Sequence, residues 1–533
     1  MASTEIRAVV SPRPTPVLPA NILRWAVLTS IFAAGALLRF RYLAVKPLWF
    51  DECFSVGVAW LNWRDFALVL WKREANMSLY YAMLRGWLHF GGSVFFIRSL
   101  SVIAALAALP AIHWLGRLLF DRRVAIIATA LLAFNAYSIR YAQEARSYAW
   151  LILLCTWSRA FFVSAIKTPS RWVLRGYVIL SVLGVYAHFY ALLLIAAQWM
   201  AFRLLGAQNT AQVTIHDSQP AAIRADPELA RKLWGAWRSI AILVLPILVF
   251  VAKTGAGPIR WIHRPGLRDV LEYYQHMAGN HGWGLLVLFM TACAFAVAPY
   301  GQTLLARGLN TSWETWRSQF LLIWLIFPVA LTVVLSYARP LFYGRYVSFC
   351  LPAFILLASA GIARLSSVWT RSVVLAAALI LSLQGTAGYY RHDFDIERDA
   401  IGEASYFILE QARAGDALVF HIAATRAAYE VFAALQTPAG AAAEPAALAA
   451  PEIVFPRHGG RLEYRDFTGN PPEELMRATA AGHARTWVVL MHNGAAPAFD
   501  SGTRTINQVF GAPALAQQRW EFPDVEVRLY SRK

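Results

Sequence analysis

The residues best suited to chemistry in this chain are two adjacent carboxylates, Asp51 and Glu52, which follow the first long apolar segment. Acids are scarce there, because residues 1–390 contain 13 Asp or Glu against 35 Lys or Arg. Adjacent side chains lie about 100° apart on a helix and on opposite faces of a strand. One carboxylate can therefore face a reacting centre as a general base while its neighbour supports the loop. The alternative is a solvated interfacial pair bound to Arg41 or Lys46.

A second polar cluster precedes the fourth apolar segment and contains Tyr141, Glu144 and Arg146. These side chains could orient a sugar or its phosphate, since a guanidinium binds phosphate through paired hydrogen bonds. The alternative is a local ion pair between Glu144 and Arg146 that caps the following helix.

Cations near other apolar segments extend this set. Arg345-Tyr346 begins the tenth segment, where the helix macrodipole favours anions rather than an arginine. A bound lipid phosphate would supply that anion, whereas the alternative is an arginine that snorkels to the interface. His188, in a turn, is either a substrate contact or an ordinary interfacial residue. Lys72 and Arg73 in the first loop are further candidates for phosphate binding.

Composition indicates a polytopic α-helical membrane protein, since 58% of the residues are hydrophobic and the mean hydropathy is +0.45. A bilayer core requires about 20 apolar residues per helix. Eleven spans are expected, at 23–40, 94–115, 123–140, 148–166, 172–187, 189–205, 239–252, 281–300, 319–337, 346–363 and 372–390. The basic residues punctuate apolar runs, which indicates topology signals and not nucleic-acid binding. The four cysteines form no C-x-x-C pair, so neither a zinc site nor a disulfide framework is indicated.

Topology depends on residues 172–205, which could form one long helix or two short ones. A hairpin places more basic residues in the later cytoplasmic loops and is favoured. It gives a cytoplasmic tail at 1–22, a membrane domain at 23–390 and an extracytoplasmic domain at 391–533. The first outside loop is rich in tryptophan, which predicts helices lying in the membrane interface.

The tail from residue 391 changes character to a small α/β domain. Residues 415–420 predict a turn into a buried strand, 425–435 a helix, and 485–491 and 525–530 two further strands. Residues 437–450 are rich in Ala and Pro and predict a loop. Without a Gly-rich phosphate motif, this domain is assigned no chemistry of its own.

Several motifs together resemble the glycosyltransferase C superfamily, specifically bacterial membrane transferases related to protein O-mannosyltransferases and to the lipid A aminoarabinose transferase. The resemblance covers most of the chain in order. Its motifs are Trp49-Phe50-Asp51-Glu52, Leu79-Tyr80-Tyr81, Arg98-Ser99-Leu100-Ser101, the segment from Tyr141 to Tyr148, Arg345-Tyr346 and the Gly415-Asp416 strand. One departure is Asn76-Met77-Ser78, where related sequences often have His-Pro-Pro.

The resemblance implies a polyprenyl-phosphate sugar as donor, with transfer at the outer face of the plasma (inner) membrane. Asp51 is the implied general base, and Tyr80 and Tyr81 join the implied substrate-binding residues. The acceptor is a glycan, lipid or protein hydroxyl, no metal ligands are assigned, and the need for a divalent metal stays open. Two rival functions are a flippase or transporter of lipid-linked sugars and a non-catalytic protein of envelope assembly.

Overall fold

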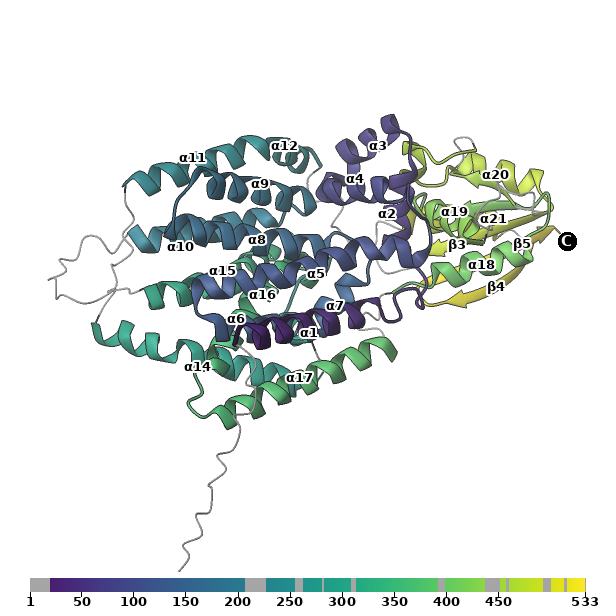
Figure 1. The fold of residues 1–533 in the computed structure, drawn as a ribbon. Coiled ribbons are helices and arrows are strands. Elements are labelled where there is room, and N and C mark those ends of the chain that lie inside the picture. Colours follow the sequence, from purple (N-terminus) through teal and green to yellow (C-terminus); the bar gives the residue numbers. More distant parts are fainter. Residues whose placement is uncertain are drawn as a thin grey trace, which may run out of the picture.

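A computed structural model describes residues 20–206, 227–254, 262–279, 282–307, 313–391, 398–436, 451–456, 460–491, 500–511 and 515–532. Most of the first 391 residues form a bundle of long helices that run side by side, with a small α/β domain at one end (Figure 1). The bundle helices are α1 (Ala20–Phe40), α5 (Val94–Leu119), α6 (Arg122–Phe134), α7 (Ala136–Ala142), α8 (Tyr148–Lys167), α9 (Arg171–Ala187), α10 (Ala191–Gly206), α11 (Pro227–Leu243), α12 (Leu245–Thr254), α13 (Leu267–Ala278), α14 (Trp283–Arg307), α15 (Trp313–Ser336), the 3₁₀ segment η5 (Gly344–Cys350), α16 (Leu351–Ala363) and α17 (Val368–Arg391).

The chain is a multi-pass membrane protein. Within the described ranges, six helices are long and apolar enough to cross a bilayer, and up to nine if each of three bent pairs is one span. Every expected span coincides with a helix or with a bent pair. The number eleven is not established, because α9 and α10 are short for a full crossing.

Residues 172–205 form two helices that fold back on each other, as the hairpin interpretation predicts. The hydroxyl of Tyr177 in α9 donates to Oε1 of Gln198 in α10 over 2.8 Å. In one continuous helix these residues would lie about 30 Å apart. The Oγ atoms of Ser158 and Ser181, 2.9 Å apart, join the same hairpin to α8.

The third expected span is interrupted at Asn135, between α6 and α7. The Asn135 side chain accepts from the backbone N–H of Ser138 and caps α7. Its amide donates to the carbonyls of Met277 and Ala278, at 3.1 Å each. Arg39 of α1 is fully buried and donates to the carbonyl of Ala133 at 2.8 Å, one of the carbonyls left free at the end of α6. These contacts set the direction in which α7 delivers the segment that follows it.

The tryptophan-rich first loop is helical, as predicted. It contains α2 (Phe50–Trp60), α3 (Trp63–Val69), the π-helical turn η1 (Leu70–Glu74), the 3₁₀ turn η2 (Ala75–Met77) and α4 (Ser78–Trp87). The side chains of Trp60, Trp63 and Trp71 are exposed. Exposed indole rings near the end of a bundle suit the membrane–water interface.

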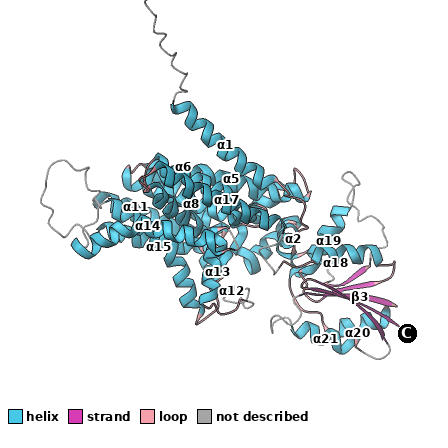
Figure 2. Ribbon diagram, turned by 90° about the horizontal axis from the view of Figure 1, so that it is seen from below, coloured by secondary structure: helices cyan, strands magenta, loops and turns pink. Residues whose placement is uncertain are grey.

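The C-terminal domain is a five-stranded sheet in the order β2-β1-β3-β5-β4, with helices on both faces (Figure 2). β1 is parallel to β2 and β3, whereas β5 is antiparallel to β3 and β4. Its elements are α18 (Ile401–Gln411), β1 (Ala417–Phe420), α19 (Thr425–Gln436), β2 (Glu452–Phe455), η6 (Tyr464–Phe467), α20 (Glu473–Gly482), β3 (Arg485–Met491), α21 (Asp500–Phe510), β4 (Leu515–Phe522) and β5 (Val525–Arg532).

Three of these strands and α19 are confirmed predictions. β2 and β4 were not predicted, because both are edge strands: two of the four β2 side chains and all of those in β4 are at least partly exposed. An edge strand of this kind lacks the apolar signal on which strand prediction depends. The loop expected at 437–450 lies outside the described residues.

Candidate active site

Asp51 and Glu52 occupy the first turn of α2, at the end of the bundle that meets the C-terminal domain (Figure 1). Carboxylates are favourable in a first helical turn, because the macrodipole is positive there. Glu52 reaches back to the backbone N–H of Trp49 at 3.4 Å, so it caps its own helix. Among the described residues, Arg41 bonds Tyr42 and Lys46 donates to a backbone carbonyl. The cations that pair with Asp51 and Glu52 are therefore not Arg41 and Lys46.

Glu52 is fully buried and joins three separate segments of the chain. Arg98 of α5 donates to both of its carboxylate oxygens, at 2.8 and 2.7 Å. The backbone N–H of Ala145 donates to Oε1 at 2.7 Å. Burial alone would raise the pKa of Glu52, but Arg98, Arg398 and this N–H outweigh it and hold the pKa below its ordinary value. Glu52 is therefore a charged carboxylate whose oxygens are already occupied.

Asp51 points away from that cluster and lies between two other guanidinium groups. Its Oδ2 is 3.6 Å from Nη2 of Arg146 and 3.6 Å from Nη2 of Arg345. At these distances Asp51 forms ion pairs with both arginines, and the separations are too long for hydrogen bonds. Its side chain is 22% exposed, whereas Glu52 is 0% exposed. Asp51 is thus the accessible acid of the pair.

Arg146 fixes the backbone beneath Asp51. Its Nη1 donates to the carbonyl oxygen of Asp51 and to Oγ of Ser55, both at 3.1 Å. The expected local ion pair between Glu144 and Arg146 does not form; Glu144 pairs instead with Arg140, at 3.3 Å. The reason is that the residues after α7 form a turn, which sends Arg146 toward α2.

Arg345 is buried and faces inward, so it does not snorkel. Its guanidinium carbon lies 5.4 Å from the ring centroid of Trp49 and 4.7 Å from that of Tyr343. Tyr148 and Tyr346 lie farther out, at 6.0 Å each. Aromatic faces stabilise a buried cation. Arg345 therefore keeps its charge beside Asp51.

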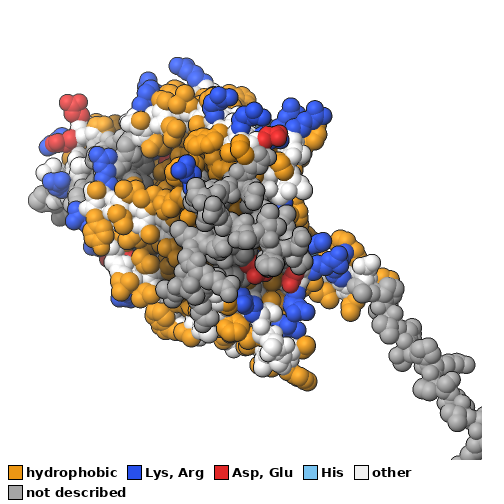
Figure 3. All heavy atoms as spheres, turned by 90° about the vertical axis from the view of Figure 1, so that its left-hand side faces the viewer, with side chains coloured by type: hydrophobic (Ala, Val, Ile, Leu, Met, Phe, Trp, Pro, Cys, Tyr) orange, Lys and Arg blue, Asp and Glu red, His pale blue; other side chains and the backbone are white. Residues whose placement is uncertain are grey.

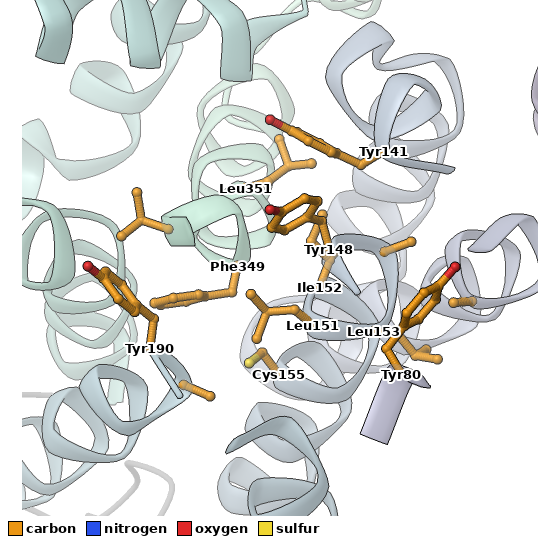
Figure 4. Close-up of a cluster of buried hydrophobic side chains, with 14 of the residues drawn as sticks. Tyr80, Tyr141, Tyr148, Leu151, Ile152, Leu153, Cys155, Tyr190, Phe349 and Leu351 are labelled. Atoms are coloured by element: carbon orange, nitrogen blue, oxygen red, sulfur yellow. The ribbon is translucent and has the colours of Figure 1, made fainter. Parts of the chain in front are cut away.

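Buried and half-buried aromatic rings lie among these charged residues. The centroids of Tyr141 and Tyr148 are 5.2 Å apart, and those of His188 and Tyr346 are 4.9 Å apart. Figure 4 shows the hydroxyl groups of Tyr141 and Tyr148 pointing to the same side. Burial, together with Arg146 and Arg345, lowers the pKa of His188 to about 3. His188 is therefore a neutral ring at ordinary pH.

Three buried polar atoms in the segment from Glu144 to Tyr148 have no hydrogen-bond partner among the described residues. They are the hydroxyl of Tyr148, Oε2 of Glu144 and Nε of Arg146. Buried polar groups are nearly always bonded in folded proteins. Two of these residues, Arg146 and Tyr148, interact with the charge of Asp51, and a polar ligand bound there would satisfy their free atoms.

The first loop adds a carboxylate that was not predicted, Glu74 at the end of η1. It accepts from the hydroxyl of Tyr81 at 3.4 Å. Burial raises the pKa of Glu74, while the nearby Arg146 and Arg73 oppose that shift and Asp51 adds to it. The scarcity of acids in residues 1–390, which singled out Asp51, applies equally to Glu74. π-Helical turns are frequent at functional sites.

Three other residues predicted to bind substrate or phosphate lie in different environments: Lys72, Arg73 and Tyr80. Lys72 is exposed, and its ammonium lies 5.3 Å from the ring of Tyr464 in the C-terminal domain. Arg73 is half-buried beside Glu74. Tyr80 is fully buried, 6.4 Å from Tyr81 between ring centroids.

A cavity of about 230 Å³ opens beside Arg345. Its walls come from α7, from α13 and the residues before it, and from the start of η5 and the residues before it. It is lined by Tyr137, Arg140, Tyr141, His263, Pro265, Asp269, Glu272, Tyr273, His276, Phe342, Tyr343, Gly344 and Arg345. Across the described part of the chain, no group of three or more His, Cys, Asp or Glu residues could hold a metal ion. The arginines are the cations that the described residues themselves supply to the site.

Comparison with known proteins finds solved structures with a similar fold but no protein related by sequence. Neither a family model nor a curated protein matches the sequence. The fold is similar to the crystal structure of ArnT from Cupriavidus metallidurans in the apo state, with a TM-score of 0.57 and 11% identity over 96% of this chain and 98% of that one. It is also similar to the same ArnT bound to undecaprenyl phosphate, with a TM-score of 0.55 and 13% identity over 95% and 98%.

Proposed function

We propose that the chain is a membrane glycosyltransferase that moves a sugar from a polyprenyl-phosphate carrier to a hydroxyl group of a glycan, lipid or protein. The observation that carries the proposal is the position of Asp51. It is an accessible carboxylate whose Oδ2 lies 3.6 Å from each of two buried guanidinium groups, Arg146 and Arg345. A base beside two fixed cations suits a reaction in which a proton is removed while a phosphate departs.

The proposed reaction is a single displacement at the anomeric carbon. Asp51 takes the proton of the acceptor hydroxyl as that oxygen bonds to the carbon. The bond from the carbon to the carrier phosphate breaks, and its electron pair leaves with the phosphate oxygen. Arg345 and Arg146 stabilise the charge that collects there. One displacement inverts the anomeric configuration and requires no covalent intermediate.

Asp51 and the two arginines form mutual ion pairs in this structure. The donor phosphate, a singly charged diester, would compete for the same guanidinium groups, and it becomes a dianion that they bind more strongly as the sugar leaves. Its arrival would release Asp51 to act as a base. The ligand of the ArnT structure, undecaprenyl phosphate, belongs to this class, which supports a lipid phosphate as the donor's leaving group.

We propose that the site faces outward, because basic side chains are frequent at the opposite end of the bundle. The end opposite the C-terminal domain carries many exposed basic side chains and few acidic ones (Figure 3), among them Arg117, Arg122, Arg123, Lys167, Arg171, Arg175 and Arg203. Positively charged loops remain in the cytoplasm. The Asp51 end and residues 391–533 would then be extracytoplasmic, in the plasma (inner) membrane.

Asp51→Asn tests the proposal against its rivals. Mass spectrometry of lipid-linked glycans and envelope glycoconjugates, with and without the gene, identifies the product. The variant should express and fold normally yet lose that product. A flippase, or a protein that acts only by binding, would retain full activity with an amide in place of the Asp51 carboxylate, and that result would remove Asp51 as the base.

A further inference from the structure

The first residues of the C-terminal domain contact the start of α2. The carboxylate of Asp399 accepts from the backbone N–H of Phe50, with Oδ1 at 3.1 Å and Oδ2 at 3.2 Å. Its Oδ1 also accepts from the N–H of Ile401, at 3.3 Å, where α18 begins. One buried side chain therefore caps two helices, the helix that carries Asp51 and the first helix of the C-terminal domain.

The preceding residue reinforces this contact. Nη2 of Arg398 lies 3.8 Å from Oε2 of Glu52, and its guanidinium carbon lies 5.9 Å from the ring centroid of Trp49. Two consecutive residues of the domain thus engage three of the four residues from Trp49 to Glu52. The N–H groups of Trp49 and Phe50 are capped by Glu52 and Asp399, respectively.

Farther along, α2 packs on the domain itself. A Cβ atom built on Gly57 would lie 2.7 Å from Cβ of Ala427 in α19, so the two helices approach as closely as a glycine allows. The rings of Phe54 and Phe467 meet edge to face, with centroids 5.3 Å apart. The body of α2 is therefore held by the C-terminal domain and its first turn by residues 398 and 399.

We infer that the C-terminal domain positions the general base, and that Asp399 and Arg398 are the positioning residues through which it does so. This inference rests on the proposed function, since it assigns to the domain a role in the same site. Asp399 acts through the backbone of α2 and Arg398 through Glu52. Displacing a reacting group by about 1 Å can lower a rate about 100-fold.

The test compares four variants of the full-length protein: Asp399→Ala, Asp399→Asn, Arg398→Gln and, as a matched surface control, Asp524→Asn. Asp524 is exposed in the β4–β5 turn at φ 55°, a conformation that asparagine tolerates. Hydrogen–deuterium exchange of peptides from residues 49–60 reports the order of α2 without any ligand. Product yield, by mass spectrometry of membranes, reports transfer.

Asp399→Ala should speed exchange in the first turn of α2 about tenfold or more and reduce transfer, because both caps are lost. Asp399→Asn should keep both exchange and transfer at the wild-type level, since a single amide oxygen can accept hydrogen bonds from the N–H groups of Phe50 and Ile401. Arg398→Gln should speed exchange less, and Asp524→Asn should match the wild type.

Unchanged exchange in both Asp399→Ala and Arg398→Gln would overturn the inference, as would faster exchange with undiminished transfer. Arg398→Gln keeps the test open if Asp399→Ala fails to fold, because it leaves both caps in place. Failure of the proposed function has a different signature. Asp51→Asn would then yield wild-type product, whatever exchange the Asp399 variants show.

Discussion

The carboxylate of Asp51 and the guanidinium of Arg345 lie 3.6 Å apart, although one follows the first helix of the bundle and the other precedes one of its last. The contact joins two distant parts of the bundle, and it pairs the proposed base with the cation proposed to bind a phosphate. A phosphate that binds the Arg345 guanidinium would break this ion pair and leave the Asp51 carboxylate able to accept a proton.

The two adjacent acids should respond differently to neutralisation. Asp51→Asn should reduce transfer by about 100-fold or more, the usual contribution of a general base, while the protein folds normally. Glu52→Gln should lower stability by about 3 to 5 kcal/mol, because it leaves Arg98 buried without its anion. Product analysis and thermal unfolding in detergent separate the two effects. Equal loss of stability in both variants would contradict the separation.

Arg345 should bind the carrier phosphate. Arg345→Gln should weaken binding of undecaprenyl phosphate about tenfold or more, because a charge-assisted hydrogen bond is lost. Ligand-induced stabilisation of the purified protein measures this, with undecaprenol as the uncharged ligand. Arg268→Gln is the matched control, since Arg268 is exposed and paired with Glu272. If the alcohol stabilises as well as the phosphate, the arginine has no role in recognition.

Asp399 should make stability depend on pH. Burial raises the pKa of Asp399 from its ordinary 3.8 to about 7, against the opposing hydrogen bonds from Phe50 and Ile401. Between pH 3.8 and about 7, Asp399 therefore keeps its proton in the folded protein but has lost it in the unfolded chain. The contribution of Asp399 to the free energy of unfolding falls as the pH rises toward 7. Between pH 5 and 8 the unfolding midpoint of the wild type should fall relative to that of Asp399→Asn. Parallel curves would refute this.

Two tyrosine hydroxyls should differ in their contribution to stability. The hydroxyl of Tyr148 has no partner among the described residues, so Tyr148→Phe should leave stability unchanged or slightly raised while reducing transfer. Tyr177→Phe is the matched control. Its hydroxyl bonds Gln198 and Trp237, and its loss should lower the unfolding midpoint. A destabilised Tyr148→Phe would mean that its hydroxyl is structural.

Membrane orientation can be read from introduced cysteines, because all four native cysteines are buried. Cysteine at position 524 should react with an impermeant maleimide added to intact spheroplasts. Cysteine at position 122, at the opposite end of the bundle, should react only after lysis. The reverse pattern would turn the proposed site toward the cytoplasm.

Local properties could be predicted from the sequence. The apolar runs predict nearly every helix of the bundle. Strands 417–420 and 485–491 were found from their apolar runs, and 525–530 from its alternation of apolar and charged residues. The acid pair stood out because acids are scarce near lipid. The carboxylates of Asp51 and Glu52 point in different directions because adjacent side chains on a helix are separated by about 100°, whatever the tertiary structure.

Partners distant in sequence were decided only by the tertiary structure. Composition marks Arg98, Arg146 and Arg345 as cations but does not say that the first binds Glu52 while the others flank Asp51. Asp399 has no local signal at all, since its role arises where the C-terminal domain meets α2. A charge in a low-dielectric interior takes the nearest partner in space, and that partner is set by how the helices pack. The sequence by itself determined which acid pair to suspect, and the packing decided that Asp51 is the one left accessible.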